Sequence, residues 1–159
     1  MYAELRELLY DAEEHYLKSE EIDKLRQNVE SLKERLAIYK ELRNREIDIF
    51  QAIANELEKE LDPTEVEQLP ELIVHWARIL RYLAMGMLLN SNEFIQRRIL
   101  EWITPVRQAH SSVSLDKQVY KSLYSQLKNL LPQEKWEILQ PYLLLVEQTM
   151  LRENETEVV

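Results

Sequence analysis

The sequence predicts an all-α protein, and three observations lead to this prediction. The 159-residue chain holds one glycine and five prolines, too few of the residues that form the tight turns between strands. Apolar side chains recur along most of the chain at i, i+3, i+4 and i+7, the spacing of one helix face. Apolar residues make up 45% and charged residues 31%, as in a globular domain that buries a core. We therefore expect a single helical domain over residues 1–151.

The first predicted helix covers residues 2–15. Leu5, Leu8 and Leu9 fall on one face of it, because positions three and four apart are neighbours on a helix surface. A terminal helix has few neighbours to cover such a stripe, and an exposed apolar stripe is typical of a protein–protein interface. We therefore predict that Leu5, Leu8 and Leu9 belong to a dimer interface.

The second predicted helix begins at Ser19, whose hydroxyl is suited to capping the free amides of a first turn. The two glutamates that follow it lie at the positive end of the helix dipole. The apolar seam then continues with a period near 3.5, and we expect a break near residues 28–33. Residues 2–30 would form an N-terminal two-helix hairpin, and residues 31–151 the helical core.

The next helix is expected to end at Asp62-Pro63, because proline disfavours α geometry in the residue before it. Pro70 then suits the first turn of a long helix at about 70–90, where the missing N–H is not needed. Further helices are predicted at 93–109, with an interruption near Thr104-Pro105, and at 115–130 and 132–151, followed by a disordered tail at 152–159.

Gly86 lies inside this long predicted helix, where glycine costs about 1 kcal/mol relative to alanine. A backbone accepts that cost where a second helix approaches closely. Ala52 and Ala54, on the preceding helix, are small enough to be the opposing contact. We therefore predict a close helix crossing formed by Ala52, Ala54 and Gly86, the alternative being a glycine with no packing role.

The net charge of −9 is carried by the first part of the chain. Residues 1–70 hold 10 Lys+Arg and 19 Asp+Glu, a net of −9, whereas residues 71–159 hold 10 of each. An acidic half repels phosphate backbones, so no nucleic-acid binding is predicted. This acidic half is either a solvated helical face or a docking surface for a basic partner.

The chain contains no cysteine, which rules out disulfides, thiolate metal sites and thioether-linked cofactors. No run of about 18 apolar residues occurs, so no membrane insertion is predicted. The first residues also lack the order of charges and apolar residues of a secretion signal. We expect a protein that stays in the cytoplasm.

Nothing in the sequence predicts an enzyme. Adjacent glutamates on a helix point apart and make poor acid–base pairs, and no phosphate-binding loop or nucleophile motif occurs. His15, His75 and His110 lack the spacing of metal ligands, so no metal site is predicted. A haem site would need His110 on a helix facing the iron, but a loop explains its sequence surroundings at least as well.

Residues 11–22, Asp-Ala-Glu-Glu-His-Tyr-Leu-Lys-Ser-Glu-Glu-Ile, resemble the start of a phycobiliprotein subunit. That family has there an acid, a basic residue, an aromatic residue, leucine, a serine-containing turn, glutamate and isoleucine. The similarity covers about residues 2–151. Its further matches are Leu36, Leu42, Ala54 and Leu61 before the proline break, and Ile79, Tyr82, Leu83 and Met85 in the long helix.

The resemblance implies a phycocyanin-like fold, which is a globin-like helical bundle preceded by a two-helix N-terminal extension. In the family this extension docks against a partner subunit, which agrees with the apolar stripe near the N-terminus. The resemblance also implies protein–protein interaction within the phycobilisome, the light-harvesting antenna of photosynthesis in cyanobacteria. The partner would be a second copy of the chain, or a phycobilisome subunit or linker. The protein would then lie in the cytoplasm, peripheral to the thylakoid through the antenna.

The sequence departs from the family at the pigment site. In the family's long helix a cysteine holds a linear tetrapyrrole, and an arginine and an aspartate just after it bind the pigment. The similar positions here are His75, Ala77 and Arg78. A thioether needs a cysteine sulfur, and arginine cannot accept hydrogen bonds from pyrrole N–H groups. We therefore predict no covalent bilin and no cofactor, with His75, Arg78 and Tyr82 as what remains of a ligand pocket.

Two functions follow from the resemblance and this departure. The first is a pigment-free, phycobiliprotein-like interaction protein in assembly, remodelling or regulation of the antenna. The second is a sensor or carrier that binds a tetrapyrrole or another small ligand without a covalent bond, in a globin-like pocket. His75 would be a ligand contact only in the second. Arg78 and Arg81 either clamp propionates or pair with the acidic half.

Overall fold

A computed structural model of the chain describes residues 2–99, 101 and 113–151. Six helices and no strand occur in this part of the chain, so the all-α prediction is confirmed. The helices are α1 (Tyr2–Glu14), α2 (Ser19–Glu60), α3 (Pro63–Leu89), α4 (Asn92–Arg98), α6 (Val113–Leu130) and α7 (Gln133–Met150). The predicted interruption at Thr104-Pro105, His110 and the tail at 152–159 lie outside the described residues.

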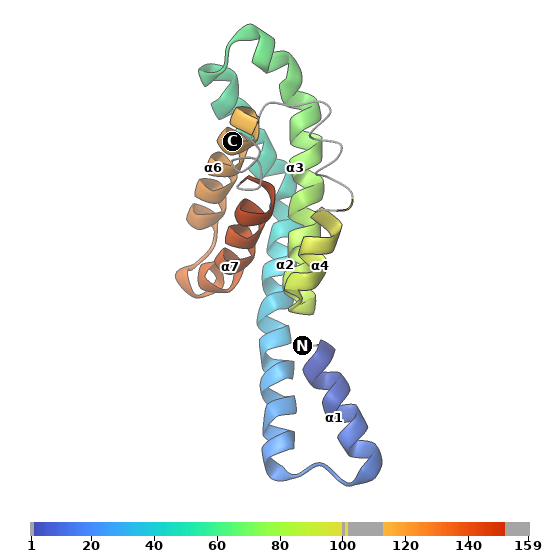
Figure 1. Ribbon diagram of the computed structural model, residues 1–159. Helices are drawn as coiled ribbons and strands as arrows, with labels where there is room; N and C mark the ends of the chain where they lie inside the picture. Colours follow the sequence, from blue (N-terminus) through green and yellow to red (C-terminus); the bar gives the residue numbers. More distant parts are fainter. Residues whose placement is uncertain (1, 100, 102–112, 152–159) are drawn as a thin grey trace.

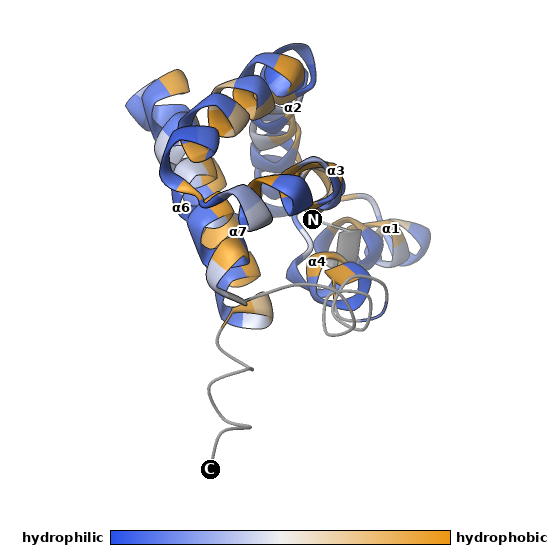
Figure 2. Cartoon of the chain, turned by 90° about the horizontal axis from the view of Figure 1, so that it is seen from above, coloured by the Kyte–Doolittle hydropathy of each residue, from blue (hydrophilic) through white to orange (hydrophobic). Residues whose placement is uncertain are grey.

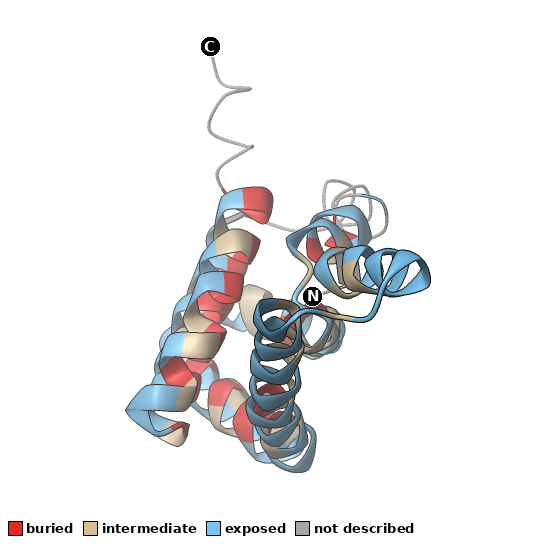
Figure 3. Cartoon of the chain, turned by 90° about the horizontal axis from the view of Figure 1, so that it is seen from below, coloured by how far each residue is buried: buried red, intermediate tan, exposed pale blue. Residues whose placement is uncertain are grey.

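The bundle is built around the two longest helices, α2 and α3. The second half of α2 packs against α3 and α6, and α4 and α7 close the bundle against α3. Figure 1 shows α1 alongside the first half of α2, away from the other helices. Seen from below in Figure 3, the N-terminal part of α2 is almost entirely exposed, whereas α6 and α7 carry many buried residues. Residues 19–34 of α2 are therefore an extension that packs on α1, and contact with the core begins at Arg35 and Ile38.

The predicted break near residues 28–33 is wrong, because α2 is one unbroken helix of 42 residues. No glycine or proline occurs within it, so nothing in this segment opposes the helix. The hairpin of α1 and α2 exists, and its second helix continues past residue 30 into the core without a break. Ser19 is also not the cap: the cap residue is Lys18, whose backbone N–H donates to the Glu21 carboxylate at 2.8 Å.

The long helix α3 begins seven residues before the predicted start at Pro70. Asp62 caps it, because its carboxylate accepts from the Glu65 backbone N–H at 2.9 Å and the Glu65 carboxylate accepts from the Asp62 N–H at 3.2 Å. Pro63 occupies the first turn, where its missing N–H is not needed. The Asp62-Pro63 pair therefore ends one helix and starts the next, and Pro70 lies inside α3 in an exposed position.

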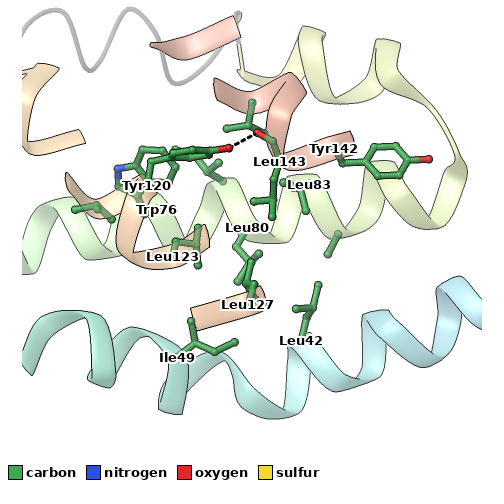
Figure 4. Packing of buried hydrophobic residues seen from close by; sticks show 14 of the residues in the cluster. Leu42, Ile49, Trp76, Leu80, Leu83, Tyr120, Leu123, Leu127, Tyr142 and Leu143 are labelled. Carbon is green, nitrogen blue, oxygen red and sulfur yellow. Dashed lines mark hydrogen bonds between the residues drawn. The ribbon is translucent and has the colours of Figure 1, made fainter. Parts of the chain in front are cut away.

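The core lies where α2, α3, α6 and α7 meet, and Figure 4 shows its packing from close by. In Figure 2 hydrophobic and hydrophilic segments alternate along the helices, as expected for helices with one apolar face. Trp76 is fully buried, and its indole N–H donates to the Asp116 carboxylate at 2.9 Å. Tyr120 donates to the Leu143 carbonyl at 3.0 Å. Both polar groups of these buried aromatic side chains are thus satisfied inside the core.

By length and composition, α3 is the one helix in the described residues that is apolar enough to cross a membrane. No run of about 18 apolar residues marks such a segment in the sequence. Within its most apolar window 44% of the residues are buried inside the protein. A core helix of a helical bundle passes the same test, so this finding is weak support for membrane insertion.

The predicted crossing of Gly86 with Ala52 and Ala54 is not the contact that the structure shows. A β-carbon on Gly86 would lie 2.6 Å from Cδ1 of Ile95 and closer still to its Cγ1. Ile95 belongs to α4 and is fully buried. The glycine therefore makes room for the short helix after the α3 turn, whereas Ala52 and Ala54 are half-buried on α2. The close approach was predicted correctly, but its partner was not.

Candidate functional site

His75, Arg78 and Tyr82 lie along one side of α3, at positions i, i+3 and i+7. His75 is half-buried, and its Nε2 lies 3.9 Å from the Glu71 carboxylate one turn earlier. Arg78 is exposed, and Tyr82 packs partly against the core. The described residues contain no group of three His, Asp or Glu that could hold a metal ion. These three side chains share one side of α3, and none of them lines a cavity described below.

The inward side of α3 is occupied by its own large side chains. Trp76 packs against Tyr120 with ring centroids 6.0 Å apart, and Tyr124 meets Trp136 edge-on at 4.9 Å. Burial raises the pKa of Tyr120, so its hydroxyl stays a hydrogen-bond donor. These aromatic side chains form a packed wall between α3, α6 and α7.

A cavity of about 240 Å³ lies between α2 and α3. On its rim Arg81 donates to both carboxylate oxygens of Glu46, at 2.7 and 2.9 Å. This bidentate pair raises the pKa of Arg81, through the hydrogen bond first and the charge second. Arg81 thus pairs with the acidic half of the chain, which was one of the two interpretations of its sequence. The lining residues are Tyr39, Leu42, Arg43, Glu46, Leu80, Arg81 and Ala84.

The apolar stripe on α1 is divided by its packing on α2. Leu5 and Leu8 are half-buried, whereas Leu9 is 69% exposed. A cavity of about 620 Å³ lies between the two helices, and most of its lining residues are polar. Leu9 is therefore the member of the stripe that remains available to a partner, while Leu5 and Leu8 help to hold the hairpin.

Arg35 joins the hairpin helix to the core, and no sequence signal pointed to it. It is only 3% exposed on α2, and its guanidinium donates to the Met87 and Leu88 carbonyls at the end of α3. Burial lowers the pKa of Arg35. Asn90, which ends α3 in the left-handed conformation (φ 52°), accepts from the Tyr142 hydroxyl at 2.7 Å. Helices α2, α3 and α7 therefore meet at one polar junction inside an apolar core.

The comparisons with known proteins agree with this architecture. The family model described as phycobilisome protein matches residues 8–150. No curated protein sequence matches the chain. The match together with the helical bundle and its N-terminal extension confirms the globin-like, phycocyanin-like fold. The chain belongs to the phycobilisome protein family.

Proposed function

We propose that this protein is a pigment-free subunit of the phycobilisome family that acts through protein–protein contacts in assembly, remodelling or regulation of the antenna. We further propose that it works in the cytoplasm, at the thylakoid surface through the antenna. The absence of a catalytic arrangement in the sequence supports a binding role over an enzymatic one.

One observation carries the proposal: the long helix has His75 where the resemblance expects the pigment-bearing cysteine, and the chain holds no cysteine at all. Without a thiol no thioether to a bilin can form. The positions around it offer no replacement, because Arg78 is a donor where an acceptor is needed and His75 is turned toward Glu71. The family fold is therefore kept while its means of holding pigment covalently is missing.

The cavity between α2 and α3 measures about 240 Å³, below the roughly 300–1,000 Å³ of pockets for drug-sized ligands. A partner's side chain suits a recess of this size. His75, Arg78 and Tyr82 do not line it, so the cavity supports a partner contact and does not bear on the pigment position.

The exposed apolar residues of the hairpin support a partner. Leu9 and Tyr10 are 69% and 57% exposed on α1, and such side chains are covered in most assemblies. We propose a homodimer, or a complex with a phycobilisome subunit or linker, in which α1 is part of the contact.

A sensor or carrier of a small ligand is the second candidate, and one observation favours it. A groove of about 580 Å³ between α6 and α7 has Tyr120, Tyr124 and Leu144 in its wall and two lysines, Lys117 and Lys121, on α6. Glu147 and Leu151 complete the lining, so an apolar ligand with an acidic group would suit the lysine side of the groove. Its lining contains none of His75, Arg78 and Tyr82, so the predicted pocket residues would not be involved.

Pigment loading separates the two candidates. The protein is co-expressed with bilin and bilin lyases, beside a pigment-bearing subunit of the family as the positive control. We expect no zinc-enhanced fluorescence on a denaturing gel at about 19 kDa, and no visible absorbance of the native protein. A fluorescent band would overturn the proposal. Absorbance without a covalent band would favour the carrier.

A further inference from the structure

The outward face of α2 carries a row of exposed apolar side chains. Ile22, Val29, Leu36 and Ile47 are 44%, 47%, 39% and 81% exposed. They follow one another by steps of 7, 7 and 11 residues, and both steps return to nearly the same side of an α-helix. At about 1.5 Å per residue, the row is about 38 Å long. We call these four residues the α2 stripe.

The charges beside the α2 stripe are all basic. Arg26, Lys33, Lys40 and Arg43 are exposed within about 60° of its centre line, at about 100° per residue. The acids of this segment, such as Glu30, Glu41 and Asp48, fall farther round the helix. No ion pair forms at Lys33, Lys40 or Arg43 within the described chain, and Arg26 has only a long contact of 3.9 Å with Asp23. The more acidic half of the chain thus presents an apolar row flanked by basic side chains. We call the α2 stripe together with Arg26, Lys33, Lys40 and Arg43 the strip.

The cavity between α2 and α3 opens beside the middle of this strip. Arg43 and Tyr39 line it from α2, and Leu80 and Ala84 form part of its wall from α3. Protein interfaces gain most of their affinity where one large side chain fills such a recess. The strip therefore combines a length of apolar contacts and flanking basic side chains with a recess for an anchoring side chain. The acid of that recess, Glu46, is paired with Arg81.

A second copy of α2 does not suit this surface. Two α2 stripes facing each other would bring Lys33 and Lys40 of each copy against a face whose charges are also basic. Like charges across an interface are unfavourable, and between residues 22 and 47 no acid of α2 lies close enough to the centre line to compensate. Glu58 lies near that line, but it stands 11 residues beyond Ile47. The strip instead complements a helix that carries both apolar residues and acids.

We propose that the α2 stripe, with Lys33, Lys40, Arg43 and the adjoining cavity, is the docking surface for an acidic amphipathic helix of another protein. The apolar residues of that helix recur every seven residues, and its acids flank them. One apolar side chain of the helix enters the cavity beside Arg43. This surface includes neither α1 nor the predicted pigment position at His75, Arg78 and Tyr82. It therefore adds a second contact to the proposed function.

Two synthetic peptides test the proposal against the whole protein by fluorescence anisotropy. Both are 25-residue helices with leucine at heptad positions a and d; one has glutamate at the flanking positions and the other lysine. We expect the acidic peptide to bind at least tenfold more tightly, with affinity that falls as salt rises. Equal binding of the two peptides, or none by the acidic one, overturns the proposal.

Charge reversal locates the site. Lys33→Glu with Lys40→Glu should weaken acidic-peptide binding about tenfold or more. The matched control, Lys59→Glu with Lys128→Glu, makes the same change in net charge on other exposed positions and should bind as wild type. Equal losses in both pairs would mean that net charge alone is responsible and would overturn the assignment. Circular dichroism confirms that each variant is folded.

Two further measurements distinguish other occupants. Tighter binding to phosphatidylglycerol vesicles than to the acidic peptide, lost in the Lys33/Lys40 variant, would make the strip a membrane contact and overturn the proposal. Sedimentation that turned a wild-type dimer into a monomer in the same variant would make it a self-contact, which also overturns it. We expect neither result. A single row of four apolar side chains offers little area to insert into a membrane, and the basic side chains of two copies would repel each other.

Discussion

Arg35 and Leu88 are joined by a hydrogen bond from a buried guanidinium to the carbonyl in the last turn of α3. This bond connects the helix that carries the hairpin to the helix in which the resemblance places the pigment position. The last carbonyls of a helix have no partner within it, and a positive charge there also suits the helix dipole. Arg35 is therefore the first buried residue of α2 after the hairpin, and it fixes this helix to the end of α3.

Replacing Arg35 with methionine should destabilise the protein by about 2 kcal/mol, because the Leu88 carbonyl would lose its donor while remaining in the core. For a chain of this size that corresponds to a fall in Tm of roughly 4–8 °C. Arg26→Met, at a 68% exposed side chain on the same helix, is the control and should shift Tm by little. An unchanged Tm for Arg35→Met would mean that water replaces the guanidinium at no cost.

Gly86→Ala should lower stability although alanine is the better helix former. The helix preference favours alanine by about 1 kcal/mol, but the new β-carbon overlaps the fully buried Ile95, and overpacking costs typically about 1–3 kcal/mol. A double-mutant cycle with Ile95→Ala checks the partner, because the alanine at 86 should cost less once Ile95 is shortened. A higher Tm for Gly86→Ala alone would contradict the contact.

Leu9→Glu should convert the proposed homodimer to a monomer in sedimentation velocity, with helicity unchanged. Leu9 is exposed in the single chain, so a carboxylate at this position should not affect folding. In a dimer the carboxylate would be buried without a partner, which is unfavourable. Leu5→Glu is a poorer test because Leu5 is half-buried within the hairpin. Leu144→Glu, at an exposed leucine of α7, is the control. Wild type that sediments as a monomer at tens of micromolar would contradict the homodimer.

The start of α2 should depend on pH through Glu21. The Lys18 backbone N–H holds the pKa of the Glu21 carboxyl below its ordinary value, and nearby His15 acts in the same direction. A lowered pKa in the folded state means that the stabilisation is present above the unfolded pKa and is lost as pH falls through the folded pKa. Glu21→Gln should therefore speed amide exchange at residues 18–22 at neutral pH and make no difference in strong acid. An equal effect of Glu21→Gln at both pH values would argue against the charge.

The sequence predicted the helical class, the family and the presence of an N-terminal hairpin, because these depend on features spread over many residues. The spacing of apolar residues and the shortage of glycine are properties of the whole sequence, so predictions made from them do not depend on any single tertiary contact. Asp62-Pro63 predicts the end of one helix, but it also marks the start of α3. Glu65, three residues after Asp62, completes the signature of a capping box.

The contacts between distant segments could not be predicted in the same way. The glycine at position 86 predicted a close approach of another segment. The segment is α4 with Ile95, which the turn at Asn90 brings back against α3. In the sequence Arg35 is one of many charged residues on a predicted helix. It is buried because the end of α3, with the Met87 and Leu88 carbonyls, packs against it. The ligand-pocket prediction for His75, Arg78 and Tyr82 rests on the resemblance and stays a prediction, because the structure shows only that the three residues share one side of α3.

Reassembly of the antenna tests the central claim most directly. Purified protein is mixed with phycobilisome subunits dissociated in low phosphate, the assemblies are re-formed and separated on a sucrose gradient, and each fraction is analysed by denaturing gel. A pigment-free antenna subunit should appear as a band of about 19 kDa in the coloured fractions while adding no fluorescence of its own under zinc. If the protein stays at the top of the gradient while the coloured subunits reassemble without it, the account is contradicted.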